Sequence, residues 1–240
     1  MIRALACLLI WSGAAHAACR QALALGLDMS TSVDTVEYRL QLEGLASALQ
    51  SDAVQEVLFA QPDASIRIAV YEWSGPPNQT LVLPWTELRT PADLADAVRT
   101  IRGHKRITAA PTTAIGAALL YGFALLDAQP DCWKRTLDLS GDGETNTGPR
   151  PEDISSDRTP PGVSVNGLVI GSGNARGDDH RFADIKALSA YYRSNVVRGP
   201  GAFVEVALGF EDYAAAMERK LLRELASIAI GQLGDSANSR

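Results

Sequence analysis

Apolar residues along this chain fall into two patterns: short continuous runs, and longer stretches in which they recur at helical spacing. The continuous runs are bounded by turn residues, which is typical of buried strands. They predict strands over residues 23–27, 66–73, 80–85, 134–140, 163–170 and 202–207. The helical spacing predicts helices over residues 33–50, 54–59, 91–101, 113–126, 178–192 and 211–230.

The order of these elements predicts an α/β fold of the doubly wound class. Strands and helices alternate along most of the chain, so most strands are expected to be parallel, with helices on both faces of the sheet. The exception is the pair 66–73 and 80–85, which the turn Gly75-Pro76-Pro77-Asn78 joins as an antiparallel hairpin. Pro84 favours an edge position for the second strand of that pair. We therefore expect a mostly parallel six-stranded sheet with one antiparallel edge strand.

The first residues have the features of an export signal. Arg3 precedes a short apolar stretch, and Ala15-His16-Ala17 fits the small-x-small pattern of a cleavage site. We interpret residues 1–17 as a signal peptide and residues 18–240 as one domain. No second apolar run of spanning length follows, so no integral membrane segment is expected after cleavage. This predicts a periplasmic or secreted protein.

Charge and cysteine content narrow the partners and the compartment. The formal net charge is −6, which argues against nucleic acid or an anionic membrane surface as a partner. Of the 3 cysteines, Cys7 would leave with the signal, so Cys19 and Cys132 remain as a pair. Cys19 and Cys132 precede Asp28 and Asp142, at the ends of two predicted strands, by similar intervals, so neighbouring parallel strands would bring the cysteines together at the opposite sheet edge. We favour a Cys19–Cys132 disulfide over two free thiols.

Oxygen-bearing side chains follow two of the predicted strands and precede one helix. Asp28, Ser30 and Ser32 come directly after the first apolar run, Asp142 follows the strand 134–140, and Thr113 opens the helix 113–126. Ligands of open α/β sheets bind at the carboxyl ends of strands, and hard oxygen ligands suit Mg²⁺, Mn²⁺ or Ca²⁺. Each residue also has a plainer reading. The serines and Thr113 would cap helices, and Asp142 would belong to a simple turn.

Taken together, these residues resemble the metal-ion-dependent adhesion site (MIDAS) of a von Willebrand factor A domain. The family pattern is Asp-x-Ser-x-Ser after the first strand, Thr-x-x-Gly at a helix start and Asp-Gly after the fourth strand. Here the last two are Thr113 with Gly116, and Asp142-Gly143. The resemblance extends over the mature chain and includes the order of the elements.

The resemblance implies a role for each residue. Ser30 and Ser32 would bind the ion directly, Thr113 directly or through water, and Asp28 and Asp142 mainly through water. A carboxylate from a protein partner would complete the coordination of Mg²⁺, or of Mn²⁺ or Ca²⁺. Thr112 stands where the family usually has glycine; Thr112 and Asp138 would lie behind the ligands and orient them.

A more specific resemblance is to an uncharacterised group of exported bacterial proteins with this fold. The phrases that carry it are Glu72-Trp73-Ser74-Gly75, Ser140-Gly141-Asp142-Gly143-Glu144-Thr145-Asn146 and Gly199-Pro200-Gly201-Ala202-Phe203-Val204. No function is established for that group, so this resemblance adds nothing to the functional prediction.

Two residue types outside this pattern have competing interpretations. Asp138 lies inside an apolar strand, where a buried carboxylate needs hydrogen bonds; it either supports the metal loop or lies near a solvated strand end. His104 and His180 are isolated in predicted loops, which predicts surface positions.

The sequence leaves three functions in competition. The first is a cation-dependent protein-binding module that captures an acidic group and is not an enzyme. The second is a metal-dependent hydrolase that uses the same aspartates. The third is a structural domain with a vestigial site. The hydroxyl-rich pattern supplies no evident general base or nucleophile pair, which favours the binding module.

Overall fold

The computed structural model describes residues 18–106, 110–171 and 178–235, and the expected signal peptide lies outside these ranges. The division into a signal peptide and one domain over 18–240 therefore stays a prediction. No helix within the described ranges is long and apolar enough to cross a membrane.

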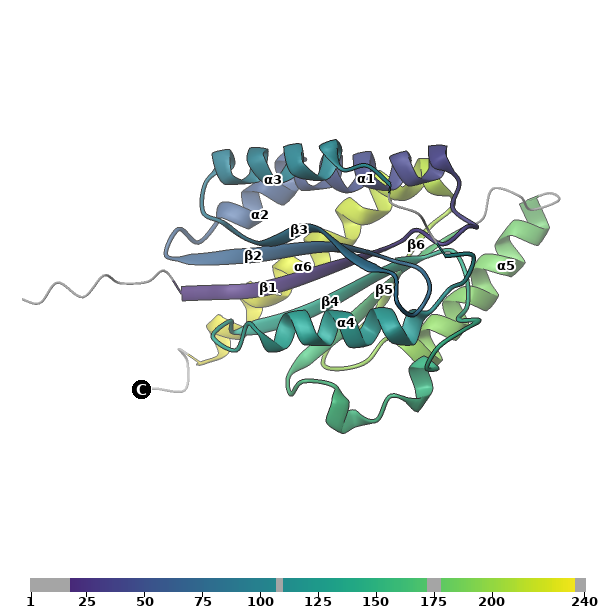
Figure 1. The fold of residues 1–240 in the computed structure, drawn as a ribbon. Helices are drawn as coiled ribbons and strands as arrows, with labels where there is room; N and C mark the ends of the chain where they lie inside the picture. Colours follow the sequence, from purple (N-terminus) through teal and green to yellow (C-terminus); the bar gives the residue numbers. More distant parts are fainter. Residues whose placement is uncertain (1–17, 107–109, 172–177, 236–240) are drawn as a thin grey trace, which may run out of the picture.

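Within the described ranges, six strands form one mixed sheet in the order β3-β2-β1-β4-β5-β6 (Figure 1). Only the β2–β3 pair is antiparallel, and β3 lies at an edge, which confirms the predicted doubly wound class. The ladder between β2 and β3 is irregular near Pro84, as expected for a residue without a donor N–H. The strands are β1 (Ala18–Asp28), β2 (Ala64–Trp73), β3 (Gln79–Leu88), β4 (Lys134–Gly141), β5 (Val163–Ile170) and β6 (Val204–Ala207).

Helices cover both faces of the sheet, and each face has its own apolar core. The leucines of β1 pack with α1, α2, α3 and α6, whereas the alanines of β1 face α4 and the end of α5. Because β1 is covered on both sides, its sequence is a continuous apolar run and does not alternate. The helices are α1 (Thr35–Leu49), α2 (Asp52–Phe59), α3 (Pro91–Gly103), α4 (Ile115–Asp127), α5 (Asp178–Tyr191) and α6 (Tyr213–Asp235).

Four short helical segments complete the connections. Three are single 3₁₀ turns, and the fourth is a π-helix that continues directly from α5. They are η1 (Pro151–Asp153), η2 (Ser156–Arg158), the π-helix η3 (Tyr192–Val196) and η4 (Phe210–Asp212).

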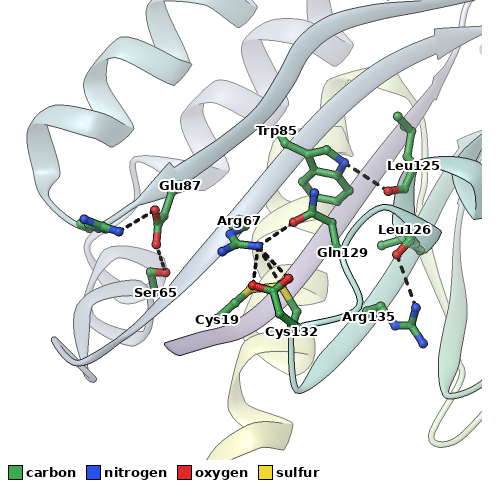
Figure 2. Close-up of a disulfide and its surroundings, with 12 residues drawn as sticks. Cys19, Ser65, Arg67, Trp85, Glu87, Leu125, Leu126, Gln129, Cys132 and Arg135 are labelled. Atoms are coloured by element: carbon green, nitrogen blue, oxygen red, sulfur yellow. Dashed lines mark hydrogen bonds and ion pairs between the residues drawn. A yellow bond between two sulfur atoms is a disulfide. The ribbon is translucent and has the colours of Figure 1, made fainter. Parts of the chain in front are cut away.

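The disulfide joins the start of β1 to the loop before β4, at the amino ends of these two neighbouring strands (Figure 2). Cys19 and Cys132 are both buried, and their Cα atoms are 4.5 Å apart. Arg67 of β2 donates to Gln129 at 2.8 Å beside the bridge. The predicted pairing is confirmed, and it lies at the sheet edge opposite to the expected metal centre.

Candidate metal centre

Asp28 and Asp142 both follow strands at the point where the sheet topology reverses. β1 and β4 are parallel neighbours in the middle of the sheet, and Leu27 is paired with Ser140. Successive connections lead outward from these two strands in opposite directions, so their carboxyl ends mark the topological switch point of the sheet. The fold therefore places both aspartates at the position where doubly wound sheets bind ligands.

The loop after β1 is held by backbone bonds and by the Asp28 side chain. The Ser30 N–H donates to Asp28 Oδ1 at 2.8 Å, and the Met29 N–H donates to the Trp73 carbonyl at 2.9 Å. The amide of Gln41 donates to the Asp28 carbonyl at 2.9 Å. These bonds hold the loop that carries Ser30 and Ser32 against the carboxyl ends of β1 and β2.

Three of the predicted ligands form one hydrogen-bonded chain. The hydroxyls of Ser30 and Ser32 are 3.0 Å apart, and Ser32 donates to Asp142 Oδ1 at 2.9 Å. Neither serine caps α1, because that role belongs to Asp34, which forms a capping box with Glu37. The capping alternative for Ser30 and Ser32 is thus wrong for α1, and the cluster joins residues that are 110 positions apart.

Thr113 is tied to the loop that carries Asp142. The Thr113 N–H donates to Asn146 Oδ1 at 2.9 Å, and the Asn146 N–H donates back to the Thr113 carbonyl at 2.9 Å. The N-cap of α4 is Ala114 and no side chain caps it, so the capping alternative for Thr113 is also wrong. A Cβ on Gly116 would collide with the Pro149 carbonyl, so glycine allows α4 to approach this loop.

The two aspartates make the cluster electrostatically suited to a cation. Burial, and then the nearby charge of Asp142, raise the pKa of Asp28 to about 7. Burial likewise raises the pKa of Asp142 above its usual range, although the Ser32 hydroxyl acts in the opposite direction. Asp28 Oδ2 is buried and has no hydrogen-bond partner among the described residues. A cation would relieve both the repulsion and the lost solvation.

The predicted donor set has two carboxylates and three hydroxyls, all of them hard oxygen ligands; the contacts of Thr113 described above are made by its backbone. Within the described ranges, no group of three or more histidine, cysteine, aspartate or glutamate side chains is placed to hold a metal. A site for zinc of the usual imidazole or thiolate type is therefore not formed by these residues. The oxygen set fits Mg²⁺, Mn²⁺ or Ca²⁺, provided that water or a partner supplies further oxygens.

Asp138 and Thr112 do not contact this cluster through any hydrogen bond that the described residues make. Asp138 is 1% exposed, so the alternative of a solvated strand end is wrong. Its carboxylate lies 2.7 Å from Lys220 of α6, and Lys220 also lies 2.6 Å from Glu224. The Thr112 hydroxyl faces Gly75 across the neighbouring loop. An orienting role for these two residues stays a prediction.

Glu72 is a further buried carboxylate near the loop after β1; the phrase Glu72-Trp73-Ser74-Gly75 carries the resemblance to exported bacterial proteins but does not predict its contacts. Glu72 of β2 accepts a hydrogen bond from the Tyr38 hydroxyl, and its other oxygen lies 3.3 Å from His104 Nε2. The His104 side chain is only 17% exposed, so the expectation of an isolated surface histidine is wrong. Arg106 packs over the Tyr38 ring and donates to the Met29 carbonyl at 3.0 Å. These residues support the loop after β1, which carries Ser30 and Ser32, from the side of β2.

Residues 18–229 match the family described as a protein of unknown function, DUF1194. The chain belongs to this family. No curated protein matches the sequence. The DUF1194 chain therefore has to be compared with other proteins through its fold.

Solved structures show that this DUF1194 member has a von Willebrand factor A-like fold. Proximal thread matrix protein 1 of the mussel byssus, described with a zinc-occupied MIDAS motif, is 18% identical with a TM-score of 0.56; the match covers 88% of this chain and 47% of that one. A von Willebrand factor type A protein from Catenulispora acidiphila is 14% identical with a TM-score of 0.56, covering 86% and 43%.

The pilus adhesin SpaC from Lactobacillus rhamnosus GG also has this fold within a larger protein. It is 14% identical with a TM-score of 0.55, and the match covers 88% of this chain and 30% of that one. The chain spans less than half of the length of each of these three structures. At these identities the likeness shows a shared fold.

Proposed function

We propose that this protein is an exported, divalent-cation-dependent binding module that captures an acidic group of a protein partner. Asp28, Ser30, Ser32, Thr113 and Asp142 would hold the ion, with Mg²⁺ as the expected cation and Mn²⁺ or Ca²⁺ as alternatives. The single observation that carries this proposal is the chain of contacts from Ser30 through Ser32 to Asp142, next to the buried carboxylate of Asp28.

The chemistry of the cluster supports binding of an acidic group. The two carboxylates balance the charge of a divalent ion only when both are ionised, and the three hydroxyls add no charge. Because the hydroxyls would be the direct ligands, the ion would be held mainly by neutral oxygens. Such an ion keeps a strong affinity for a further carboxylate. The bound ion would supply that attraction, while this chain's own residues fix its position at the rim of the sheet.

Two further observations support export and protein binding. The buried disulfide fits an oxidising compartment, as does the predicted signal peptide. Among structures with this fold are a protein described with a zinc-occupied MIDAS motif and a pilus adhesin. These descriptions belong to those proteins, and they make a binding role a reasonable first test for this one.

Calorimetric titration of Mg²⁺, Mn²⁺ and Ca²⁺ into residues 18–240 tests the metal centre. Asp142→Ala should abolish binding because it removes one of the two carboxylates and the acceptor of Ser32. Asp127→Ala is the matched control, since Asp127 is exposed at the far end of α4 and should leave affinity unchanged. Circular dichroism confirms that both variants fold. Cation binding that Asp142→Ala leaves intact would contradict the proposed ligand set.

Capture of an acidic group needs a separate measurement. Immobilised peptides that carry one glutamate, and matched peptides with glutamine in its place, are exposed to the protein in Mg²⁺ and in EDTA. We expect retention only on the glutamate peptides and only with Mg²⁺. Equal retention in EDTA would show binding that does not use the metal centre.

A further inference from the structure

Near the carboxyl ends of β1 and β2, three buried polar atoms have no hydrogen-bond partner among the described residues. They are Asp28 Oδ2 on β1, the Trp73 indole Nε1 on β2 and the Tyr192 hydroxyl on η3. All three side chains are completely buried. Polar groups buried in this way are normally satisfied by protein or by an ordered water, so their coincidence at one place points to a bound molecule.

The three groups converge on Gly141, the last residue of β4. A Cβ placed there would collide with the Tyr192 hydroxyl and would lie 3.2 Å from Asp28 Oδ2 and 3.4 Å from Trp73 Cζ2. Burial raises the pKa of the Tyr192 phenol, and the charge of Asp28 raises it further, which agrees with this proximity. The absence of a side chain at Gly141 thus allows the Tyr192 hydroxyl, Asp28 Oδ2 and the Trp73 ring to lie together against the end of β4.

The π-helix η3 holds the Tyr192 ring beside Gly141. Tyr192 is the first residue of η3, and its carbonyl accepts from the Val197 N–H at 3.0 Å. On the other side, a Cβ on Gly167 would lie 2.7 Å from Tyr192 Cδ1, so the ring packs directly on the β5 backbone. π-Helical turns recur at functional sites because they reposition a side chain that a regular helix would direct elsewhere.

The chemistry of the three groups selects water as the molecule that joins them. A carboxylate oxygen accepts, an indole N–H only donates, and a phenol hydroxyl does both. A cation is disfavoured because the indole N–H would point its positive end at the ion. One water molecule can donate to Asp28 while it accepts from Trp73 and exchanges a bond with Tyr192, which matches the usual number of partners of a buried water.

We propose that a buried water links Tyr192 and Trp73 to Asp28 Oδ2 and makes Tyr192 a positioning residue of the metal centre. This inference rests on the proposed function. Asp28 Oδ1 is already held by the Ser30 N–H, so a second bond at Oδ2 fixes the rotation of the carboxylate. Without it, part of the metal-binding free energy is spent on ordering Asp28.

Tyr192→Phe tests the proposal because it removes only the hydroxyl. If the hydroxyl binds the water, the variant has a lower Tm in EDTA and binds Mg²⁺ about tenfold more weakly, as found for outer partners of metal ligands. If the hydroxyl is truly unpartnered, its removal raises the Tm, since an unsatisfied buried group is deleted. A higher Tm, or an unchanged Mg²⁺ affinity in a wild-type protein that binds Mg²⁺, overturns the proposal.

Tyr213→Phe is the matched control. Tyr213 is equally buried, and its hydroxyl lies 3.1 Å from Ser140 Oγ in the core that α6 forms on the other face of the sheet. This variant should lose Tm but keep the Mg²⁺ affinity of the wild type. An equal loss of affinity in both variants would indicate general loosening and would contradict a specific role for Tyr192.

The failure of this inference can be separated from the failure of the proposed function. If the wild-type protein binds no cation, the proposed function fails, while the direction of the Tm change in EDTA still reports whether the Tyr192 hydroxyl has a partner. A crystal structure of the metal-free protein provides the second readout. Ordered density between Tyr192 and Asp28 supports the bridge, and a dry space there refutes it.

Discussion

Replacing Asp28 with asparagine should stabilise the metal-free protein at neutral pH while removing its response to Mg²⁺. The Asp28 carboxyl is completely buried, and its pKa is raised from 3.8 to about 7, first by burial and then by the charge of Asp142. Asparagine keeps the oxygen that accepts from the Ser30 N–H but carries no charge. The substitution therefore removes the electrostatic cost and retains the turn.

The magnitude follows from the difference in pKa between the folded and unfolded states. A shift of about three pKa units corresponds to about 4 kcal/mol of unfolding free energy above pH 7. The asparagine amide must also be accommodated, so we expect a gain of about 2 to 4 kcal/mol. For a domain of this size that is a Tm increase of roughly 4–16 °C.

The pH dependence gives the sharper test. Because the folded protein binds this proton more tightly than the unfolded chain, the Asp28 contribution favours folding below pH 4. That contribution is lost as the pH rises toward 7. The pKa of Asp138 is also raised to about 7, but it contributes equally to both proteins, so their difference isolates Asp28.

Thermal and urea unfolding in EDTA at pH 4.5 and pH 8 measures this difference. The variant should gain stability at pH 8 and little at pH 4.5, and Mg²⁺ should then raise the Tm of the wild type alone. A variant that is less stable at pH 8, or a difference that does not change with pH, would refute the assignment of Asp28 as a strained metal-site carboxylate.

Two further predictions concern the stability of the fold. Lys220→Met leaves Asp138 and Glu224 buried without their shared cation and should cost about 3–5 kcal/mol in urea unfolding at pH 8. The exposed pair of Arg99 and Asp96 is the control, and Arg99→Gln should change stability by less than about 1 kcal/mol; similar losses in both would argue against burial as the cause. Replacing both Cys19 and Cys132 with serine opens a link across 113 positions and should lower the unfolding free energy by about 4–5 kcal/mol. Mg²⁺ affinity should not change because the bridge lies at the opposite sheet edge, and a parallel loss of affinity would show that the two edges are coupled.

The positions of Asp28 and Asp142 at the carboxyl edge of the sheet were predictable from local sequence, whereas their role as ligands stays a prediction. Asp28 and Asp142 follow strands, and a residue just beyond a buried parallel strand must lie at the carboxyl edge of the sheet. The disulfide was predictable for the same reason, since Cys19 lies at the start of β1 and Cys132 lies just before β4. Neither prediction required knowledge of any side-chain contact.

The supporting residues were not predictable because their roles depend on contacts between distant elements. Tyr192 reaches Gly141 only because a π-helical turn directs its ring across β5, and no sequence rule places that turn. His104 meets Glu72 because the residue that follows α3 lies against the carboxyl end of β2. Asn146 meets Thr113 because two loops approach each other at the sheet edge.

The sequence by itself determined the order and type of the elements, the antiparallel edge strand, and which residues lie at each sheet edge. Hydrophobic periodicity and turn chemistry act over a few residues and are read directly from the chain. The tertiary structure alone decided which buried polar groups meet, namely Lys220 with Asp138 and Tyr38 with Glu72, and that Tyr192 and Asp28 both lie against Gly141. Such pairs depend on the rotation of each helix and on side-chain packing across the sheet, which local sequence patterns do not specify.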